Sequence, residues 1–128
     1  MIAEAVIDKM YSDSEITDLI KTIDPDIIKE NPTYPASYVS DSSMESIGSF
    51  SDEGIKTGVI EIGIYADTYE QCNNAARKVR QKLDNFHGMV SNVAIRIGRA
   101  EMQPDAYDEQ AGKHVKVIEY QAEAQIKE

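Results

Sequence analysis

The chain is poor in the residues that most often build reactive centres. Its 128 residues include one cysteine, two histidines and no tryptophan. A single cysteine excludes an intramolecular disulfide and fits a reducing compartment. Two histidines and one cysteine are too few for a structural zinc site, and neither His87 nor His114 lies in a nucleophile–base motif. We therefore expect no catalytic residue, no metal and no cofactor, and interpret the protein as a non-enzyme.

Long apolar runs and phosphate-binding glycine patterns are also missing. No apolar stretch approaches the roughly 20 residues of a membrane span, and the N-terminus lacks the basic region of a signal peptide. The seven glycines are scattered and form no nucleotide-binding motif. The acidic group of Asp105, Asp108 and Glu109 lacks the spacing of a calcium loop. We expect a soluble, intracellular protein without membrane or nucleotide contacts.

Positive charge is in short supply. Thirteen basic residues face 23 acidic ones, which gives a net charge of −10. This balance argues against free binding to nucleic acid, which needs clustered lysine and arginine, and against docking on anionic lipid. The excess acid either keeps the protein soluble or covers a surface that must not adhere to DNA. The length of 128 residues fits one domain, 1–128.

The first 54 residues combine helical spacing with irregular segments. Apolar residues recur at helical intervals over 2–11, and Asp13 or Ser14 is suited to cap a short second helix. Three prolines predict an irregular crossing over 24–38 that ends in a strand near Ala36–Ser40. The serine-rich segment 40–54 predicts an exposed hairpin loop, which a strand enters as far as about Ser46.

A strand followed by a helix forms the clearest block of the sequence. Residues 55–66 alternate isoleucine with polar or small residues, which predicts a strand with one buried face. The next segment, Asp67-Thr68-Tyr69-Glu70, has the spacing of a capping box. It predicts a helix that ends at His87, before Gly88. Its apolar face comprises Cys72, Ala75, Ala76, Val79, Leu83 and Phe86.

Two further strands complete the predicted fold. Alternating residues predict strands over 89–99 and 114–126, joined by a loop over 100–112. The resulting class is α+β: a mostly antiparallel four-stranded sheet with the long helix and the N-terminal helix packed on one face.

Cys72 is by default a small buried hydrophobe, although the nearby helix N-terminus would favour a reactive thiolate.

The other candidate functional residues are expected on the surface of this fold. The basic helix face, Arg77 to Lys82, is either a solvated surface or a contact for acidic loops of a neighbouring subunit. Exposed aromatic, apolar and arginine side chains are typical of interfaces. The candidate interface residues are Tyr34, Tyr38, Met44, Ile47, Phe50, Arg77, Arg80 and Tyr107.

Three segments carry a resemblance to a known family. A strand ending in Ile-Gly-Ile-Tyr-Ala-Asp-Thr-Tyr (62–69) leads into the helix Ala-Ala-Arg-Lys-Val-Arg-Gln-Lys-Leu (75–83). Upstream, Tyr-Pro-Ala-Ser-Tyr-Val (34–39) begins the first long strand, and a helix starts at Ile2. This pattern resembles the small tail-completion proteins of long-tailed bacteriophages and prophages, which are related in fold to the tail terminators.

The resemblance implies a structural role in the virion tail. Such proteins are ring-forming, often hexameric, and cap the end of the tail tube. The implied partners are further copies of this chain, the tail tube protein and the head connector or neck proteins. DNA passes nearby without specific binding, and assembly takes place in the cytoplasm of the bacterial host.

Two other readings stay open. The protein could instead be another neck component, such as a head-closure or adaptor protein. From a different class, it could be a small ferredoxin-like enzyme or ligand-binding domain with a polar cluster on the sheet. The candidates for such a cluster are Glu61, Arg96 and Glu119, which would equally serve as cross-strand pairs.

Overall fold

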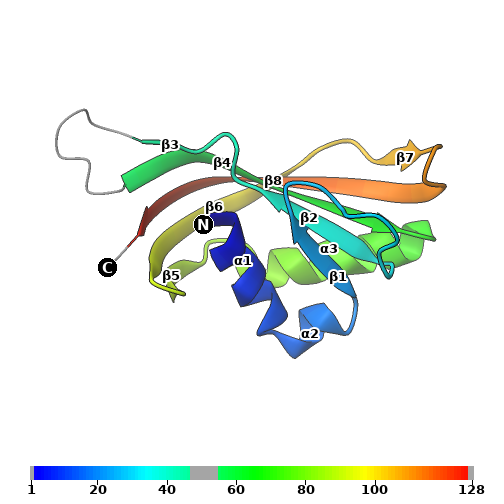
Figure 1. The fold of residues 1–128 in the computed structure, drawn as a ribbon, viewed down its shortest axis with the longest axis horizontal. Helices are drawn as coiled ribbons and strands as arrows, with labels where there is room; N and C mark the ends of the chain where they lie inside the picture. Colours follow the sequence, from blue (N-terminus) through cyan, green and yellow to red (C-terminus); the bar gives the residue numbers. More distant parts are fainter. Residues whose placement is uncertain (1, 47–54, 127–128) are drawn as a thin grey trace.

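A computed structural model describes residues 2–46 and 55–126. In this part of the chain, helices α1 (Ile2–Tyr11), α2 (Ser14–Thr17) and α3 (Tyr69–Leu83) all lie on one side of a curled sheet (Figure 1). The α+β class is therefore confirmed. The strands are β1 (Thr22–Pro25), β2 (Ala36–Ser40), β3 (Glu45–Ser46), β4 (Ile55–Ala66), β5 (His87–Val90), β6 (Val93–Met102), β7 (Ala106–Asp108) and β8 (Lys113–Ile126).

The predicted mostly antiparallel four-stranded sheet is wrong, because the described residues form a mixed sheet of eight strands. The order is β1-β2-β4-β8-β6-β5, with β3 added to β4 and β7 added to β8. β1 pairs with β2 in parallel, and the other pairs are antiparallel. The unpredicted strands β1 and β7 have three or four residues each, too few for a readable alternation. β3 ends at Ser46, where the first strand was expected to reach. A turn at Ser91 and Asn92 divides the predicted strand 89–99 into β5 and β6.

The long strands form the centre of the sheet, as their alternation predicts. β4 and β8 pair without interruption from Ile55↔Gln125 to Ala66↔His114. The isoleucine face of β4 is fully buried together with Ile118 and Tyr120 of β8. Since side chains alternate along a strand, the other face of β4 and β8 points away from the helices. We call that second surface the outer face.

The start of α3 follows the predicted capping box with a shift of one residue. Thr68, not Asp67, is the cap: its Oγ1 accepts a hydrogen bond from the Gln71 amide at 3.1 Å. The Gln71 side chain in turn accepts one from the Thr68 amide at 3.3 Å. Glu70 therefore does not close the box, and its acidic side chain sits in the first turn, where the helix dipole favours it.

The predicted end of this helix is wrong. α3 stops at Leu83 with Asp84 as its cap, and Asn85 reverses the chain with a φ of 61°. His87 therefore begins the edge strand β5, and Phe86 lies in the turn between the two elements. Asn85 tolerates the left-handed conformation that ends a helix, so the stop comes before Gly88.

The sheet curls around α1. This helix packs against β1 and β2 on one side and against β5 on the other. The Tyr11 hydroxyl accepts a hydrogen bond from the Ile23 amide of β1 at 2.9 Å. On the opposite side, the Lys9 ammonium lies 3.9 Å from the centre of the Phe86 ring. α3 instead packs beneath β4 and β8, so the two larger helices cover different parts of the sheet (Figure 1).

Candidate assembly surfaces

Cys72 lies in the interior, as its position on the apolar face of α3 predicts. Its side chain is fully buried, and its thiol donates a hydrogen bond to the Ile64 carbonyl at 3.2 Å. Burial raises the pKa of the thiol to about 11, despite the opposing charge of Lys116. The thiol is therefore protonated at neutral pH and is unsuited to nucleophilic chemistry.

Other chemistry-bearing groups are dispersed over the described residues. Within 2–46 and 55–126, no three His, Cys, Asp or Glu side chains are placed to hold a metal ion together. In the same residues, no helix has both the length and the apolar character needed to cross a bilayer.

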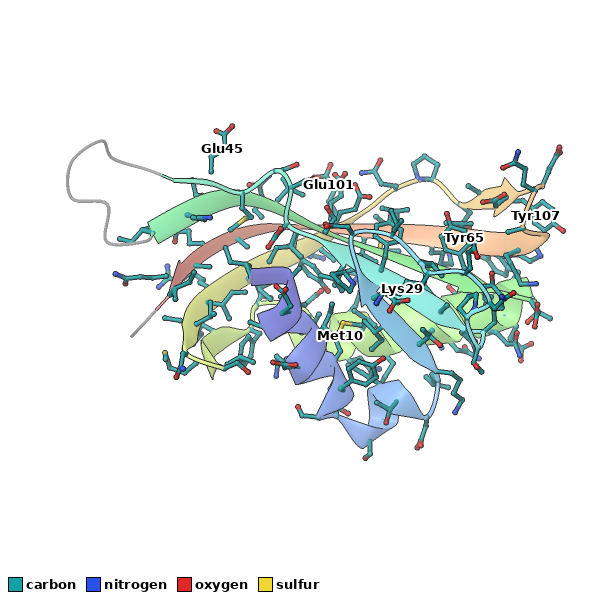
Figure 2. The ribbon with its side chains drawn as sticks, in the orientation of Figure 1. Met10, Lys29, Glu45, Tyr65, Glu101 and Tyr107 are labelled. Atoms are coloured by element: carbon teal, nitrogen blue, oxygen red, sulfur yellow. The ribbon has the colours of Figure 1, made fainter. Side chains whose placement is uncertain are left out.

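The outer face carries a shallow groove that we call the tyrosine groove. It has a volume of about 570 Å³ and lies between the segment 26–34 and the strands β2 and β4. Tyr34, Tyr38 and Tyr65 line it, and Figure 2 shows Tyr65 on the side of the sheet away from the helices. The structure thus brings together Tyr34 and Tyr38, two of the predicted interface residues.

Tyr38 is fixed in this groove by two neighbours on β4. Its ring covers Gly63, where any Cβ would overlap the ring atoms Cε2 and Cζ. Its hydroxyl donates a hydrogen bond to Glu61 Oε2 at 2.5 Å. Burial and then the Glu61 carboxylate raise the pKa of Tyr38. The tyrosine is therefore neutral and oriented across the sheet.

A row of glutamates continues across the outer face. Glu61 of β4 is paired with Glu119 of β8, which is paired with Glu101 of β6. Like charges at opposed positions destabilise a sheet, but Gln103 Nε2 donates to Glu119 Oε1 at 2.9 Å and Tyr38 donates to Glu61. Glu101 and the exposed Glu45 are labelled on the same side of the sheet (Figure 2). This part of the outer face is thus acidic.

A second groove lies between α3 and the end of β6, and we call it the arginine groove. It has a volume of about 470 Å³, and its lining includes Arg77, Arg80 and Met102. Arg80 Nη2 lies 3.4 Å from Asp84 Oδ2, and Asp84 Oδ1 accepts a hydrogen bond from Tyr120 at 2.7 Å. Within the described residues, Arg80 Nε is buried without a hydrogen-bond partner.

The predicted basic face of α3 is therefore divided in two. Lys78 and Lys82 point to the α2 side, where both pair with Glu15 at 3.1 and 2.6 Å. Arg77 lies on the other side, exposed and without an ion-pair partner among the described residues. The lysines thus stabilise the packing of α2 on α3, whereas Arg80 pairs with Asp84 on the opposite side of the helix.

One end of the molecule carries an aromatic cluster. The rings of Tyr107 and Tyr69 both meet His114 edge-on, with centroids 5.0 and 6.2 Å away. Both tyrosines are about half exposed. Nearby, Lys113 pairs with Asp67 at 2.9 Å. Tyr107 marks this end of the sheet (Figure 2), where amphipathic aromatic side chains are suited to a protein contact.

The remaining predicted interface residues have different positions. Met44 is half-buried and packs against the core. Ile47 and Phe50 lie outside the described residues. Sequence patterns missed the exposed Ile27, Tyr69 and Met102. Ile27 stands in the irregular proline-rich segment and Met102 in a predicted loop, where no periodicity marks a side chain as exposed.

The fold is one found in phage and phage-like particles. No protein-family model and no curated relative matches the sequence. The structure, however, is similar to a chain in the virion of a native gene transfer agent particle. That chain is 19% identical, with a TM-score of 0.58 over 98% of this chain and 94% of the other. The protein is also similar to the bacteriophage SPP1 gp17 protein, at 12% identity and a TM-score of 0.53, covering 92% and 86%.

Proposed function

We propose that this protein is a structural component of a phage-type tail or neck. In this proposal it assembles as a ring at the head-proximal end of the tail tube and completes the tail. The observation that carries the proposal is the likeness to a virion chain of a gene transfer agent particle, which spans nearly the whole of both chains. The tail-completion pattern in residues 34–39 and 62–83 supports the same role.

The surfaces of the molecule suit such a role. The sheet is elongated, with β7 near one end and β3 near the other (Figure 1). The two ends can therefore contact different partners, the tail tube protein and a head connector or neck protein. The acidic outer face suits a wall past which DNA moves, because like charges disfavour adhesion. The protein would then reside in the virion tail.

We propose no enzymatic activity. Two of the three polar candidates for an enzyme or ligand site make local contacts. Glu61 and Glu119 accept hydrogen bonds from Tyr38 and Gln103. Arg96 lies opposite Glu123 in the strand register, four residues along β8 from Glu119, so the three predicted polar candidates do not form one cluster.

Electron microscopy of the protein with purified tail tubes of the same particle tests the proposal. Gold-labelled protein is expected at one end of each tube, the end that joins the head. A variant with Tyr69 and Tyr107 changed to serine tests whether the aromatic end makes the tube contact. Labelling of purified portals but never of tubes would support a head-closure or adaptor protein and refute tail completion.

A further inference from the structure

Two surfaces on opposite sides of the sheet carry opposite charge. The first lies at the end of β1 and just beyond it, beside the tyrosine groove; it comprises Asp24, Asp26, Ile27 and Glu30, and we call it the acidic edge. Lys29 is the basic residue in this stretch, and it lies 3.9 Å from Asp24. Asp26 and Glu30 are exposed, and Ile27 is 71% exposed between them. Ile27 therefore presents an apolar side chain to solvent between two carboxylates.

The second surface is the arginine groove, which adjoins a free strand edge. β5 pairs with β6 only as far as Arg96. Beyond this pair, the Ile97 amide donates to the Phe86 carbonyl and the Asn85 amide donates to the Gly98 carbonyl. Beyond them, the edge of residues 99–102 that faces away from β8 pairs with no other strand within the described residues. Met102, 36% exposed, lies in the lining of the groove beside Arg77 and Arg80.

We propose that the arginine groove of one copy binds the acidic edge of a second copy. Ile27 of the second copy would pack on Met102, and Asp26 and Glu30 would meet Arg77 and Arg80. Charge complementarity selects this occupant, because arginine recognises carboxylates through charge-assisted hydrogen bonds. Arg80 contacts Asp84 through Nη2 alone, at 3.4 Å, which leaves its other terminal nitrogen for a partner. Arg77 makes no ion pair within the described residues.

The position of the two surfaces determines the type of assembly. The acidic edge adjoins β1 at one end of the strand order, and the groove adjoins β6 towards the other. Because the two surfaces lie towards opposite ends of the strand order, one copy would use them on two different neighbours, which is a heterologous arrangement. Such an arrangement produces a ring if the rotation between copies closes. The inference thus rests on the proposed ring and identifies the surfaces that would join its subunits.

Charge exchange tests this pairing in the purified protein. Sedimentation velocity at low salt, up to millimolar concentration, should show self-association of the wild type that weakens with added salt. Arg77→Glu and Glu30→Arg each replace an attraction by a repulsion, so either change alone should weaken association by about tenfold or more. The two changes together restore opposite charges across the contact and should recover the wild-type behaviour. Glu45→Arg, a matched change at an exposed position of β3, should have little effect.

The result that overturns the pairing differs from the one that overturns the proposed role. A wild type that stays monomeric at millimolar concentration, or single reversals that have no effect, would refute the pairing. So would a double variant as weak as the single ones. None of these outcomes bears on whether the protein sits at the end of the tail tube, which micrographs decide. Equally, a charge-dependent oligomer that never labels tubes would leave the pairing standing and refute tail completion.

Discussion

The contact between Tyr38 and Gly63 predicts that Gly63→Ala destabilises the wild type but stabilises a variant that lacks the Tyr38 ring. Gly63 has no side chain, and the Tyr38 ring occupies the place of its Cβ. Gly63→Ala therefore forces the ring to move. The ring is not free to do so without cost, because its hydroxyl is bonded to Glu61 at 2.5 Å.

The magnitude follows from two opposing terms. Overpacking of this kind costs about 1–3 kcal/mol, and a weakened hydrogen bond to a carboxylate adds to it. Alanine in a strand is otherwise favoured over glycine by about 0.5–1 kcal/mol, because it restricts the unfolded chain. We expect Gly63→Ala to lower the free energy of unfolding by about 2 kcal/mol in the wild type. In a Tyr38→Ala background the obstacle is gone, and the same change should raise it by about 0.5–1 kcal/mol.

Urea denaturation of the four proteins, followed by far-ultraviolet circular dichroism, measures this double-mutant cycle. With an m-value of about 1–3 kcal/mol/M, the midpoint for Gly63→Ala should fall by about 1 M. The midpoint of the double variant should lie above that of Tyr38→Ala alone. Equal effects of Gly63→Ala in the two backgrounds would refute the reasoning, because they would mean that the ring does not cover the glycine.

Three further predictions concern buried or paired groups. Cys72 should resist thiol reagents in the folded protein and react on unfolding, because a pKa of about 11 leaves about one thiolate in 10⁴ at pH 7; equal rates in both states would contradict its burial. Tyr120→Phe should lower the free energy of unfolding in urea by about 1.5–3 kcal/mol, since Asp84 loses a hydrogen bond; an unchanged midpoint would refute this contact. The hydrogen bond from Lys116 holds the pKa of Asp105 below its ordinary value of 3.8, so its stabilisation is present above that pH and is lost as the pH falls through the lowered value. Asp105→Asn should therefore flatten the loss of stability in an acid titration, and identical wild-type and variant curves would contradict the pairing.

The long elements were predictable because each repeats its signal. Residues 55–66 alternate over a dozen positions, and the helix at 2–11 shows three turns of apolar spacing. The short strands β1 and β7 carry no such repeat, and their neighbours β2 and β8 hold them in the sheet. The end of α3 was missed for another reason. Asn85 and Gly88 are both suited to a reversal, and the packing of Phe86 and β5 against their neighbours decides between them.

The sequence predicts individual interface residues, but it does not show which of them lie together on one surface. Exposed tyrosines and arginines are recognisable by type, yet Tyr38 meets Gly63 only through the register of β2 on β4. Likewise, the four basic residues of α3 look equivalent along the sequence. Only the position of α2 shows that Lys78 and Lys82 are used internally.

The basic side chains are therefore unevenly available for contacts with other molecules. Most of the lysines that the structure describes are engaged near their own backbone or with a local acid or ring, as are Lys9, Lys21, Lys29, Lys78, Lys82, Lys113 and Lys116. Arg77 and Arg99 are exposed on the β6 side without such a partner among the described residues. In a chain with a net charge of −10, uniform repulsion between copies is the default. In the proposed pairing, the arginine groove of one copy meets the acidic edge of the next, so this contact replaces repulsion by attraction.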